Sequence, residues 1–263
     1  MAKIHPLANV HPDAKLGTNV SVEAFTTIYP DVEIGDNCWI GPNVTIFDGA
    51  RLANNIKVFP GAVVSAEPQD LKYQGEKSTL EIGDNTIIRE MASLHRGTAS
   101  KGVTKIGRNC FIMAYVHIAH DCIISDNVIL VNGVQLAGEV EVNDWAIIGG
   151  TAAVHQFVRI GKHAMVQGGA LLRKDVPPYA LVGREPVVYE GINTVGLRRR
   201  GFSNEQIRLI EDIYRYVFLK GYNLKHAIEV IEKNFPFSTL KNEILRFLKT
   251  TKRGLVKSPL AVK

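Results

Sequence analysis

The stretch Ile28-Tyr29-Pro30-Asp31-Val32-Glu33-Ile34-Gly35-Asp36-Asn37-Cys38-Trp39-Ile40 carries an aliphatic residue at every sixth position. The same period runs from Ile4 to Val64, resumes from Ile82 to Leu94, and resumes again from Ile106 to Leu172. The residue two places before each of these is small or aliphatic too, and two inward positions separated by one outward residue are typical of a short strand. Because a fixed short period indicates a solenoid, the sequence predicts a parallel β-helix whose coils stack about 4.8 Å apart.

The segments between the strands are of two kinds. Steps such as Gly35-Asp36-Asn37 and Gly83-Asp84-Asn85 predict tight corners, where φ is allowed to be positive. Two longer segments, about 65–81 and 96–105, interrupt the aliphatic register. Insertions in a solenoid are extruded as loops on one face and often carry function, so we expect these loops to serve a site. A tolerated surface bulge is the alternative.

The pattern changes after Val176-Pro177-Pro178, because proline cannot continue a strand ladder. After an expected connector at 179–201, Ser203-Asn204-Glu205-Gln206 forms a capping box that predicts a helix ending at Gly221. Asn223 and Ser238 are candidate caps for two more helices. We therefore expect a mainly β solenoid over residues 1–190, followed by a small α-helical domain over 191–263 that covers its open end.

Composition excludes several classes of protein. The chain has no apolar signal segment in its first thirty residues and no apolar run long enough to cross a bilayer, so we expect no integral membrane segment. The three cysteines, Cys38, Cys110 and Cys122, lie far apart without Cys-x-x-Cys spacing, which argues against a disulfide framework or a cysteine-rich zinc site. They are interpreted as small buried residues of a cytoplasmic protein.

The charge is unevenly distributed along the chain. Residues 191–263 hold 15 Lys and Arg against 6 Asp and Glu, a balance of +9, so the preceding part carries −4 of the net +5. A basic C-terminal part on an acidic body favours an anionic partner, either nucleic acid or an acidic or phosphorylated carrier. A merely solvated face remains an alternative.

The stretch His117-Ile118-Ala119-His120-Asp121-Cys122 places two histidines and a carboxylate inside the repeat without breaking it. Ile118 and Cys122 keep the inward positions, so the polar residues occupy outward ones. Imidazole titrates near neutral pH, which makes His120 a candidate general base. A histidine satisfied at a subunit interface is the alternative. Whether Asp121 orients His120 or contacts a substrate stays open, because neighbours on a strand point to opposite faces.

Several motifs occur in a fixed order along the chain and together resemble one family. They are Gln69-Asp70-Leu71-Lys72-Tyr73, His95-Arg96-Gly97-Thr98, His117-Ile118-Ala119-His120-Asp121-Cys122, Leu136-Ala137-Gly138, Ala153-Val154-His155-Gln156-Phe157, Asp175-Val176-Pro177-Pro178-Tyr179 and Gly196-Leu197-Arg198-Arg199-Arg200-Gly201-Phe202. With the helical tail, they resemble the acyl-carrier-protein–UDP-N-acetylglucosamine O-acyltransferases, which catalyse the first step of lipid A biosynthesis. The resemblance covers essentially the whole chain.

The resemblance implies a left-handed parallel β-helix, an exception to the usual right-handed crossover, and a homotrimer with active sites in the clefts between subunits. It implies transfer of a 3-hydroxyacyl chain from acyl carrier protein to the 3-hydroxyl of UDP-N-acetylglucosamine. Neither a metal nor another cofactor is implied, and nucleic acid is not an expected partner.

The resemblance also implies roles for individual residues. His120 matches the catalytic histidine, with Asp121 beside it, and Gly138 matches the backbone donor to the oxyanion. The expected contacts to the sugar or nucleotide are Asp70, Lys72, His95, His117, Gln156, Asn193, Arg199 and Arg200. Gly168 matches a residue that limits acyl-chain length, and its lack of a side chain predicts a donor of about fourteen carbons or more. Glu139 departs from the family, which often has His there, so a side-chain role at that position is in doubt.

Three other functions remain as alternatives. The N-acyltransferase later in the same pathway carries an extra N-terminal domain, for which the repeat beginning at Ile4 leaves no room. A zinc carbonic anhydrase on the same coil would use His95, His117 and His120, although the spacing fits poorly. A non-catalytic scaffold would bind a carrier protein through the basic tail. His155 is either a packed core residue or part of a site, whereas His163 is expected to belong to the scaffold.

Overall fold

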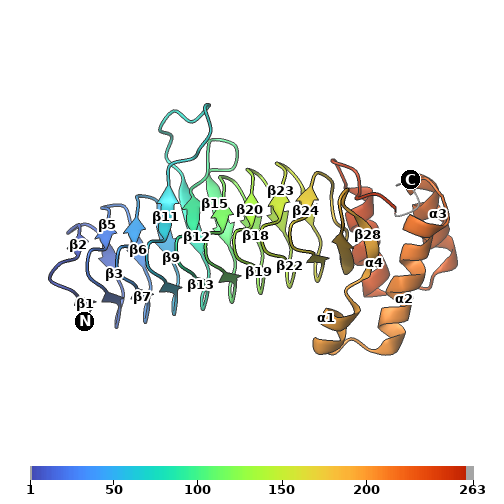
Figure 1. Ribbon diagram of the computed structural model, residues 1–263, viewed down its shortest axis with the longest axis horizontal. Helices are drawn as coiled ribbons and strands as arrows, with labels where there is room; N and C mark the ends of the chain where they lie inside the picture. The colour runs from blue at the N-terminus through green and yellow to red at the C-terminus, as the bar shows by residue number, and fades with distance from the viewer. Residues whose placement is uncertain (1, 259–263) are drawn as a thin grey trace.

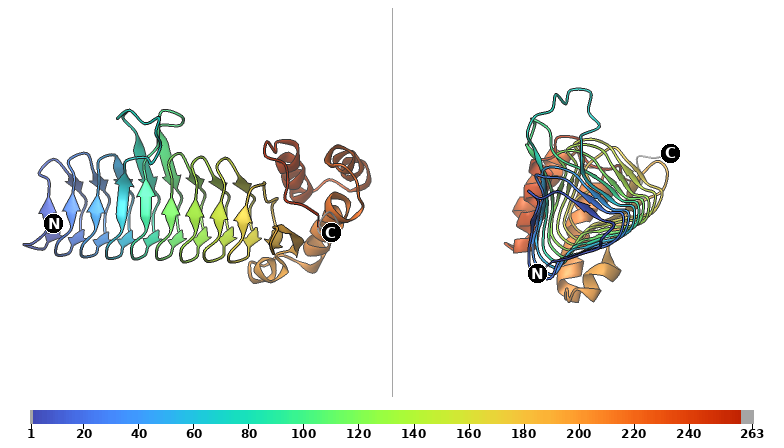
Figure 2. Two further views of the ribbon diagram at one scale, coloured as in Figure 1. Left: turned by 45° about the horizontal axis from the view of Figure 1, so that its top comes forward. Right: turned by 90° about the vertical axis from the view of Figure 1, so that its left-hand side faces the viewer.

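The aliphatic period forms the walls of a solenoid in the computed structural model, which describes residues 2–258. Within these residues the strands form three sheets, here named A, B and C, and successive strands of the chain belong to different sheets up to β27. The last strand, β28, stays in sheet A and pairs antiparallel with β27. The coil is left-handed and has a triangular outline when viewed along its axis (Figure 2). The predicted mainly β fold, a left-handed parallel β-helix with a small helical end, is confirmed.

The strand bounds follow the repeat. Sheet A contains β1 (Lys3–Ile4), β4 (Ser21–Val22), β7 (Trp39–Ile40), β10 (Lys57–Val58), β13 (Ile87–Ile88), β16 (Phe111–Ile112), β19 (Ile129–Leu130), β22 (Ile147–Ile148), β25 (Met165–Val166), β27 (Ala180–Gly183) and β28 (Val188–Ile192). Sheet B contains β2 (Asn9–Val10), β5 (Thr27–Ile28), β8 (Thr45–Ile46), β11 (Val63–Ala66), β14 (Ser93–His95), β17 (His117–Ile118), β20 (Gln135–Leu136), β23 (Ala153–Val154) and β26 (Leu171–Leu172). Sheet C contains β3 (Lys15–Leu16), β6 (Glu33–Ile34), β9 (Ala50–Leu52), β12 (Thr79–Ile82), β15 (Val103–Ile106), β18 (Ile123–Ile124), β21 (Glu141–Val142) and β24 (Arg159–Ile160).

Each coil takes 18 residues where no loop intervenes, as the parallel pairing of Lys3 with Ser21 shows. The residues of the aliphatic period point inward and stack along the axis; Ile118 and Leu136, paired in neighbouring coils, are both 0% exposed. Burying one such side chain contributes roughly 1.5–3 kcal/mol. The cysteines are free and buried in this core, as predicted.

Asparagine and glycine have different roles at the corners of the coil. Asn37 takes a φ of 57°, as predicted, and the same place in other coils is taken by residues as large as Trp145 at 63°. Gly35 has no positive φ. A Cβ at Gly35 would instead lie 2.8 Å from the carbonyl carbon of Ala53 in the next coil, so this glycine permits close stacking.

Both interrupting segments are extruded as loops where the chain passes from sheet B to sheet C, an edge here called the B–C edge (Figure 1). The first loop lies between β11 and β12, and the second between β14 and β15. Arg96 of the second loop bonds the Tyr73 hydroxyl of the first at 2.9 Å, and the Ala99 N–H donates to the Glu76 carboxylate at 2.9 Å. The two loops therefore support each other.

Helices follow the last coil: α1 (Thr194–Arg199), α2 (Asn204–Tyr214), a π-helical turn η1 (Arg215–Leu219), α3 (Leu224–Asn234) and α4 (Thr239–Lys249). The capping box at Ser203 and the caps Asn223 and Ser238 occur as predicted. The expected connector, by contrast, contains α1, which Asn193 caps.

The helices lie over the C-terminal end of the coil (Figure 1). After α4 the chain returns to the coil, where Leu255 bridges Asp175 and Lys257 bridges Val188. Among residues 2–258, no helix combines the length and the apolar character needed to cross a membrane.

Candidate active site

His120 lies at the B–C edge, in the corner between β17 and β18. Its Nδ1 is 2.8 Å from Oδ2 of Asp121, and its side chain is largely buried. Asp121 has a φ of 59°, so the chain turns between the two residues and their side chains meet. The alternation expected of an extended strand does not apply at a corner. The Asp121 carboxylate therefore contacts the His120 ring directly.

Asp121 is itself fixed by the second loop. Its carboxylate accepts the Thr98 hydroxyl at 2.6 Å, the Thr98 N–H at 3.0 Å and the Lys101 N–H at 3.2 Å. Burial alone would raise the pKa of Asp121, but hydrogen bonds from Thr98, His120 and Lys101 outweigh it and lower that pKa. The carboxylate therefore stays ionised, and it accepts the Nδ1–H of His120 while Nε2 remains free to act as a base.

Gly138 occupies the equivalent corner of the next coil, directly against the His120 ring. A Cβ at this position would lie 2.5 Å from both Cε1 and Nε2 of His120. The Gly138 N–H has no protein acceptor within residues 2–258. At the edge between sheets C and A, the equivalent N–H of Asp126 donates to the Asp144 carboxylate of the next coil at 3.1 Å. The Gly138 N–H thus remains available beside Nε2.

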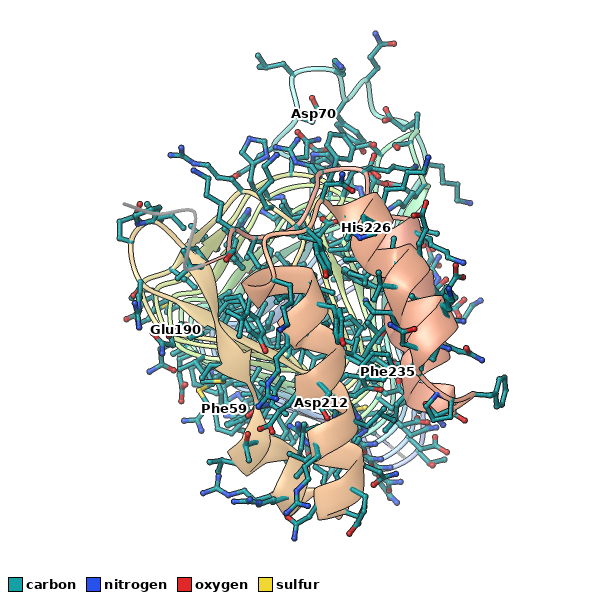
Figure 3. The ribbon with its side chains drawn as sticks, turned by 90° about the vertical axis from the view of Figure 1, so that its right-hand side faces the viewer. Phe59, Asp70, Glu190, Asp212, His226 and Phe235 are labelled. Carbon is teal, nitrogen blue, oxygen red and sulfur yellow. The ribbon has the colours of Figure 1, made fainter. Side chains whose placement is uncertain are left out.

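Other predicted residues surround the same ring. Asp70 lies on the first loop, which projects from the coil (Figure 3), and its carboxylate is 3.9 Å from His120 Nε2. His117, on β17, has its ring 5.0 Å from that of His95, whose Nδ1 is 2.5 Å from the Glu67 carbonyl oxygen. Burial, with the neighbouring His95 and His120, lowers the pKa of His117 to about 4, so this imidazole is neutral near pH 7.

Two further predicted residues are less constrained. Lys72 is exposed on the first loop, with its N–H bonded to the Asp70 carboxylate at 3.0 Å. Gln156 is partly buried and follows Gly138 by one coil at the same edge. His155 is exposed rather than packed in the core. The B–C edge thus brings together His120, Asp121, Gly138, Asp70, His117 and His95, with Gln156 one coil beyond.

Comparison with known proteins places this arrangement in a family. A family model described as UDP N-acetylglucosamine O-acyltransferase, domain 2, matches residues 175–256, and a bacterial transferase hexapeptide model matches residues 13–48 and 104–138. An acyl-[acyl-carrier-protein]–UDP-N-acetylglucosamine O-acyltransferase from Thiobacillus denitrificans is 45% identical over 258 residues, which cover 98% of this chain and 100% of that one. The chain belongs to this O-acyltransferase family.

Solved structures of the family agree with this fold over nearly the whole chain. A UDP-N-acetylglucosamine acyltransferase from Bacteroides fragilis is 46% identical with a TM-score of 0.95, covering 96% of this chain and 99% of that one. A UDP-N-acetylglucosamine acyltransferase from Campylobacter jejuni is 36% identical with a TM-score of 0.91, covering 97% and 99%. The predicted family and enzyme class are therefore confirmed.

A second group of predicted residues in this O-acyltransferase lies at the edge between sheets C and A. Asn193 caps α1, accepting the Gly196 N–H, and donates its side-chain N–H to the His163 carbonyl oxygen at 2.9 Å. The Arg200 guanidinium lies 5.2 Å from the Trp145 ring and 3.4 Å from His163 Nδ1. Arg199 is exposed on the same short helix.

The His163 ring is stacked between two aromatic rings. It lies parallel to Trp145 at 6.2 Å and to Tyr179 at 5.7 Å. Burial, followed by the charge of Arg200, lowers the pKa of His163 to about 4. In each coil, the residue just before the small inward residue lies at a corner and points outward. Trp145 occupies such a position, so this aromatic residue was the feature of the sequence that could have indicated the stack.

Gly168 lies at the third edge, in the exposed corner between β25 of sheet A and β26 of sheet B. Hence the His120–Asp121 pair, the group of Asn193, Arg199 and Arg200, and Gly168 occupy three different edges of one solenoid. A single chain does not enclose them in one pocket.

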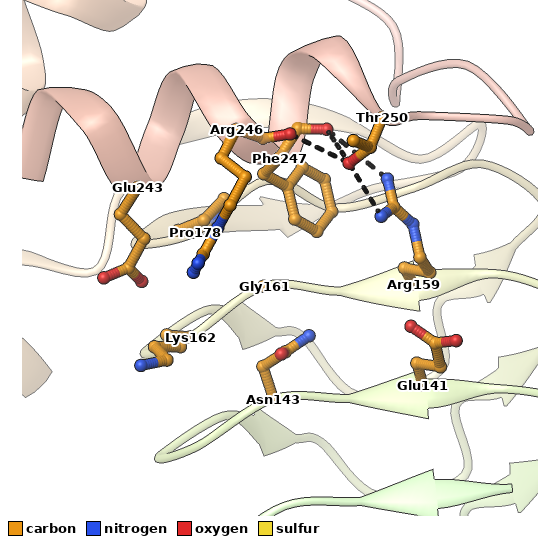
Figure 4. A pocket seen from close by; sticks show the side chains of 10 residues that line it. All are labelled: Glu141, Asn143, Arg159, Gly161, Lys162, Pro178, Glu243, Arg246, Phe247 and Thr250. Atoms are coloured by element: carbon orange, nitrogen blue, oxygen red, sulfur yellow. Dashed lines mark hydrogen bonds between the residues drawn. The ribbon is translucent and has the colours of Figure 1, made fainter.

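A pocket with a volume of about 400 Å³ lies between sheet C and α4 (Figure 4). Arg159 spans its wall, donating to the Thr250 hydroxyl at 3.1 Å. None of the predicted site residues lines it. Across residues 2–258 no group of three or more His, Cys, Asp or Glu has an arrangement suited to a metal ion.

Proposed function

We propose that the chain transfers a 3-hydroxyacyl group from acyl carrier protein to the 3-hydroxyl of UDP-N-acetylglucosamine, the first step of lipid A biosynthesis, with His120 as general base. One observation carries the proposal: the His120–Asp121 pair presents Nε2 beside the unbonded N–H of Gly138. A base and an oxyanion donor side by side are what acyl transfer to a hydroxyl requires. The names of the curated relatives supply the donor and acceptor.

The direction of proton transfer follows from the tautomer of His120. Asp121 accepts the Nδ1–H, so the lone pair on Nε2 removes the proton of the sugar hydroxyl as its oxygen attacks the thioester carbonyl. Asp70 is 3.9 Å from the same nitrogen, where a hydroxyl placed beside both can bond to each. We propose that His95, His117, Lys72 and Gln156 line the rest of the acceptor site. A neutral His117 adds no charge that would compete for the proton.

The attack forms a carbon–oxygen bond and a tetrahedral intermediate whose oxyanion accepts the Gly138 N–H. Its collapse breaks the carbon–sulfur bond, and the carrier thiolate recovers the proton from the His120 imidazolium. The products are the ester and the free carrier thiol, with no other reactant. A well-placed base contributes about 10²–10⁴-fold to such a reaction, and an oxyanion donor contributes on a similar scale.

We infer that the working form is a cytoplasmic homotrimer. The placement of three groups at three edges supports this, because copies packed side by side would bring the His120 edge of one against the Arg200 or Gly168 edge of another. Asn193, Arg199 and Arg200 then hold the nucleotide phosphates, for which the arginine fork is suited. Gly168 sets the acyl-chain length, and the basic C-terminal residues attract the acidic carrier.

Purified chain supplied with UDP-N-acetylglucosamine and a panel of acyl-carrier thioesters tests the proposal, with products identified by mass. We expect a mono-acylated sugar nucleotide esterified at the 3-hydroxyl. The His120→Ala variant should lose at least about 10²-fold in kcat while keeping the mass of the trimer in light scattering. Full turnover by this variant, or an N-acylated product, would refute the proposal.

A further inference from the structure

Glu139, in the corner between β20 and β21, contacts the second loop. Its carboxylate accepts the Ser100 hydroxyl, and its Oε2 lies 3.2 Å from Lys101 Nζ. The side chain is only 14% exposed, so water screens these contacts weakly. The Glu139 N–H also donates to the His120 carbonyl oxygen at 3.0 Å. One residue therefore touches both the catalytic coil and the loop above it.

The loop residues that Glu139 contacts are joined to those that hold Asp121. Lys101 Nζ donates to the Asp121 carbonyl oxygen at 3.0 Å, while the backbone N–H of Lys101 donates to the Asp121 carboxylate. The Ser100 N–H donates to the Thr98 hydroxyl at 3.2 Å, which in turn donates to Asp121 at 2.6 Å. A continuous set of contacts thus runs from Glu139 through the loop to Asp121 and His120.

We propose that Glu139 is a positioning residue for the acyl transfer, which anchors loop 98–102 so that Thr98 and Lys101 keep Asp121 aligned with His120. The proposal rests on the proposed function. The alternative role is direct contact with the substrate. The geometry favours the loop, because both carboxylate oxygens of Glu139 already have protein partners there.

The expected loss of kcat depends on how many other contacts hold the second loop in place. The loop keeps the contacts of Ala99 to Glu76 and of Arg96 to Tyr73 when Glu139 is removed. We therefore expect misalignment rather than collapse. Glu139→Ala should lower kcat about tenfold, equivalent to about 1.4 kcal/mol, with the KM for UDP-N-acetylglucosamine within about twofold of the wild type.

Two further comparisons separate positioning from a structural role. Glu139→Gln can still accept the Ser100 hydroxyl, so it should restore part of the lost kcat. In a Lys101→Met background, Glu139→Ala should cost much less than it does alone, because the two residues act through one contact. Glu81→Gln is the matched control, since it removes an exposed ion pair with Lys105 at 3.5 Å that does not involve Asp121. This control should keep kcat.

Hydrogen exchange provides a readout that does not depend on turnover. The amides of residues 98–102 should exchange faster in Glu139→Ala than in the wild type or in Glu81→Gln. A large rise in KM with kcat retained, additive losses with Lys101→Met, or unchanged exchange at 98–102 would each overturn the proposal. If the wild type transfers no acyl group, the proposed function fails. The hydrogen-exchange measurement would still show whether Glu139 holds residues 98–102 in place.

Discussion

Replacing Gly138 by alanine probes how tightly His120 is placed. The new Cβ would lie 2.5 Å from Cε1 and Nε2 of His120, whereas ordinary contacts begin at 3.4 Å, so the ring must move by roughly 1 Å. The ring cannot swing away freely, because Nδ1 is bonded to Asp121 at 2.8 Å. A displacement of about 1 Å at a reacting atom costs on the order of 10²-fold in rate, or roughly 2.7 kcal/mol.

The substitution isolates ring position from oxyanion binding. Alanine keeps the backbone N–H, and Gly138 does not have the positive φ that would strain another residue. The assay compares kcat for acyl transfer and the melting temperature of wild type, Gly138→Ala and Gly150→Ala. The last is a control corner glycine at the edge between sheets A and B, where a Cβ would meet the Asn132 carbonyl oxygen at 3.2 Å and not the His120 ring of the same chain.

We expect a loss of about 10²-fold in kcat for Gly138→Ala and a loss below about threefold for Gly150→Ala, with similar melting temperatures. A Gly138→Ala enzyme that keeps kcat within twofold would refute the reasoning. It would mean that the position of the His120 ring does not limit the rate.

Three other predictions concern Asp121, Gly168 and His163. Asp121→Asn should lower kcat by about 10²-fold or more in steady-state assays, because an amide does not hold the Nδ1–H tautomer. Gly168→Met should shift the preferred donor in a thioester panel to shorter chains; an unchanged preference would exclude a chain-length role. Burial lowers the pKa of His163 from an ordinary 6.5 to about 4, so between these values the unfolded chain binds more protons. The free energy of unfolding should therefore fall as pH drops from 6.5 to 4 in urea titrations, and it should fall less in His163→Gln, whereas equal slopes would contradict the assignment.

The period of six was enough to predict the coil, because burial decides which residues face inward. Ile118 and Cys122 follow that rule, and so the outward position of His117 could be predicted. The capping residues Ser203, Asn223 and Ser238 likewise predicted the helix starts, since their hydrogen bonds are local in sequence. The division near residue 190 stays a prediction.

The pattern did not reveal which outward side chains meet. The pairing of Asp121 with His120 depends on a positive φ at Asp121. In a sequence a positive φ is usually indicated by glycine or asparagine, and neither stands at this position. The contact of Glu139 with Lys101 joins residues 38 positions apart through the shape of a loop that has no period. The stack of His163 between Trp145 and Tyr179 similarly depends on coils that touch only after folding.

The constant length of the coils has a further consequence for the positions of the site residues along the axis. The chain returns to the same register every 18 residues, so its geometry along the axis is graduated in steps of about 4.8 Å. One extra coil inserted between Val142 and Ile160 would translate Arg200 and the helices by one such step away from His120, while Asp121 and its loop kept their local contacts. The distance along the axis between the His120 corner and Arg200 can thus be changed only by a whole step of the coil.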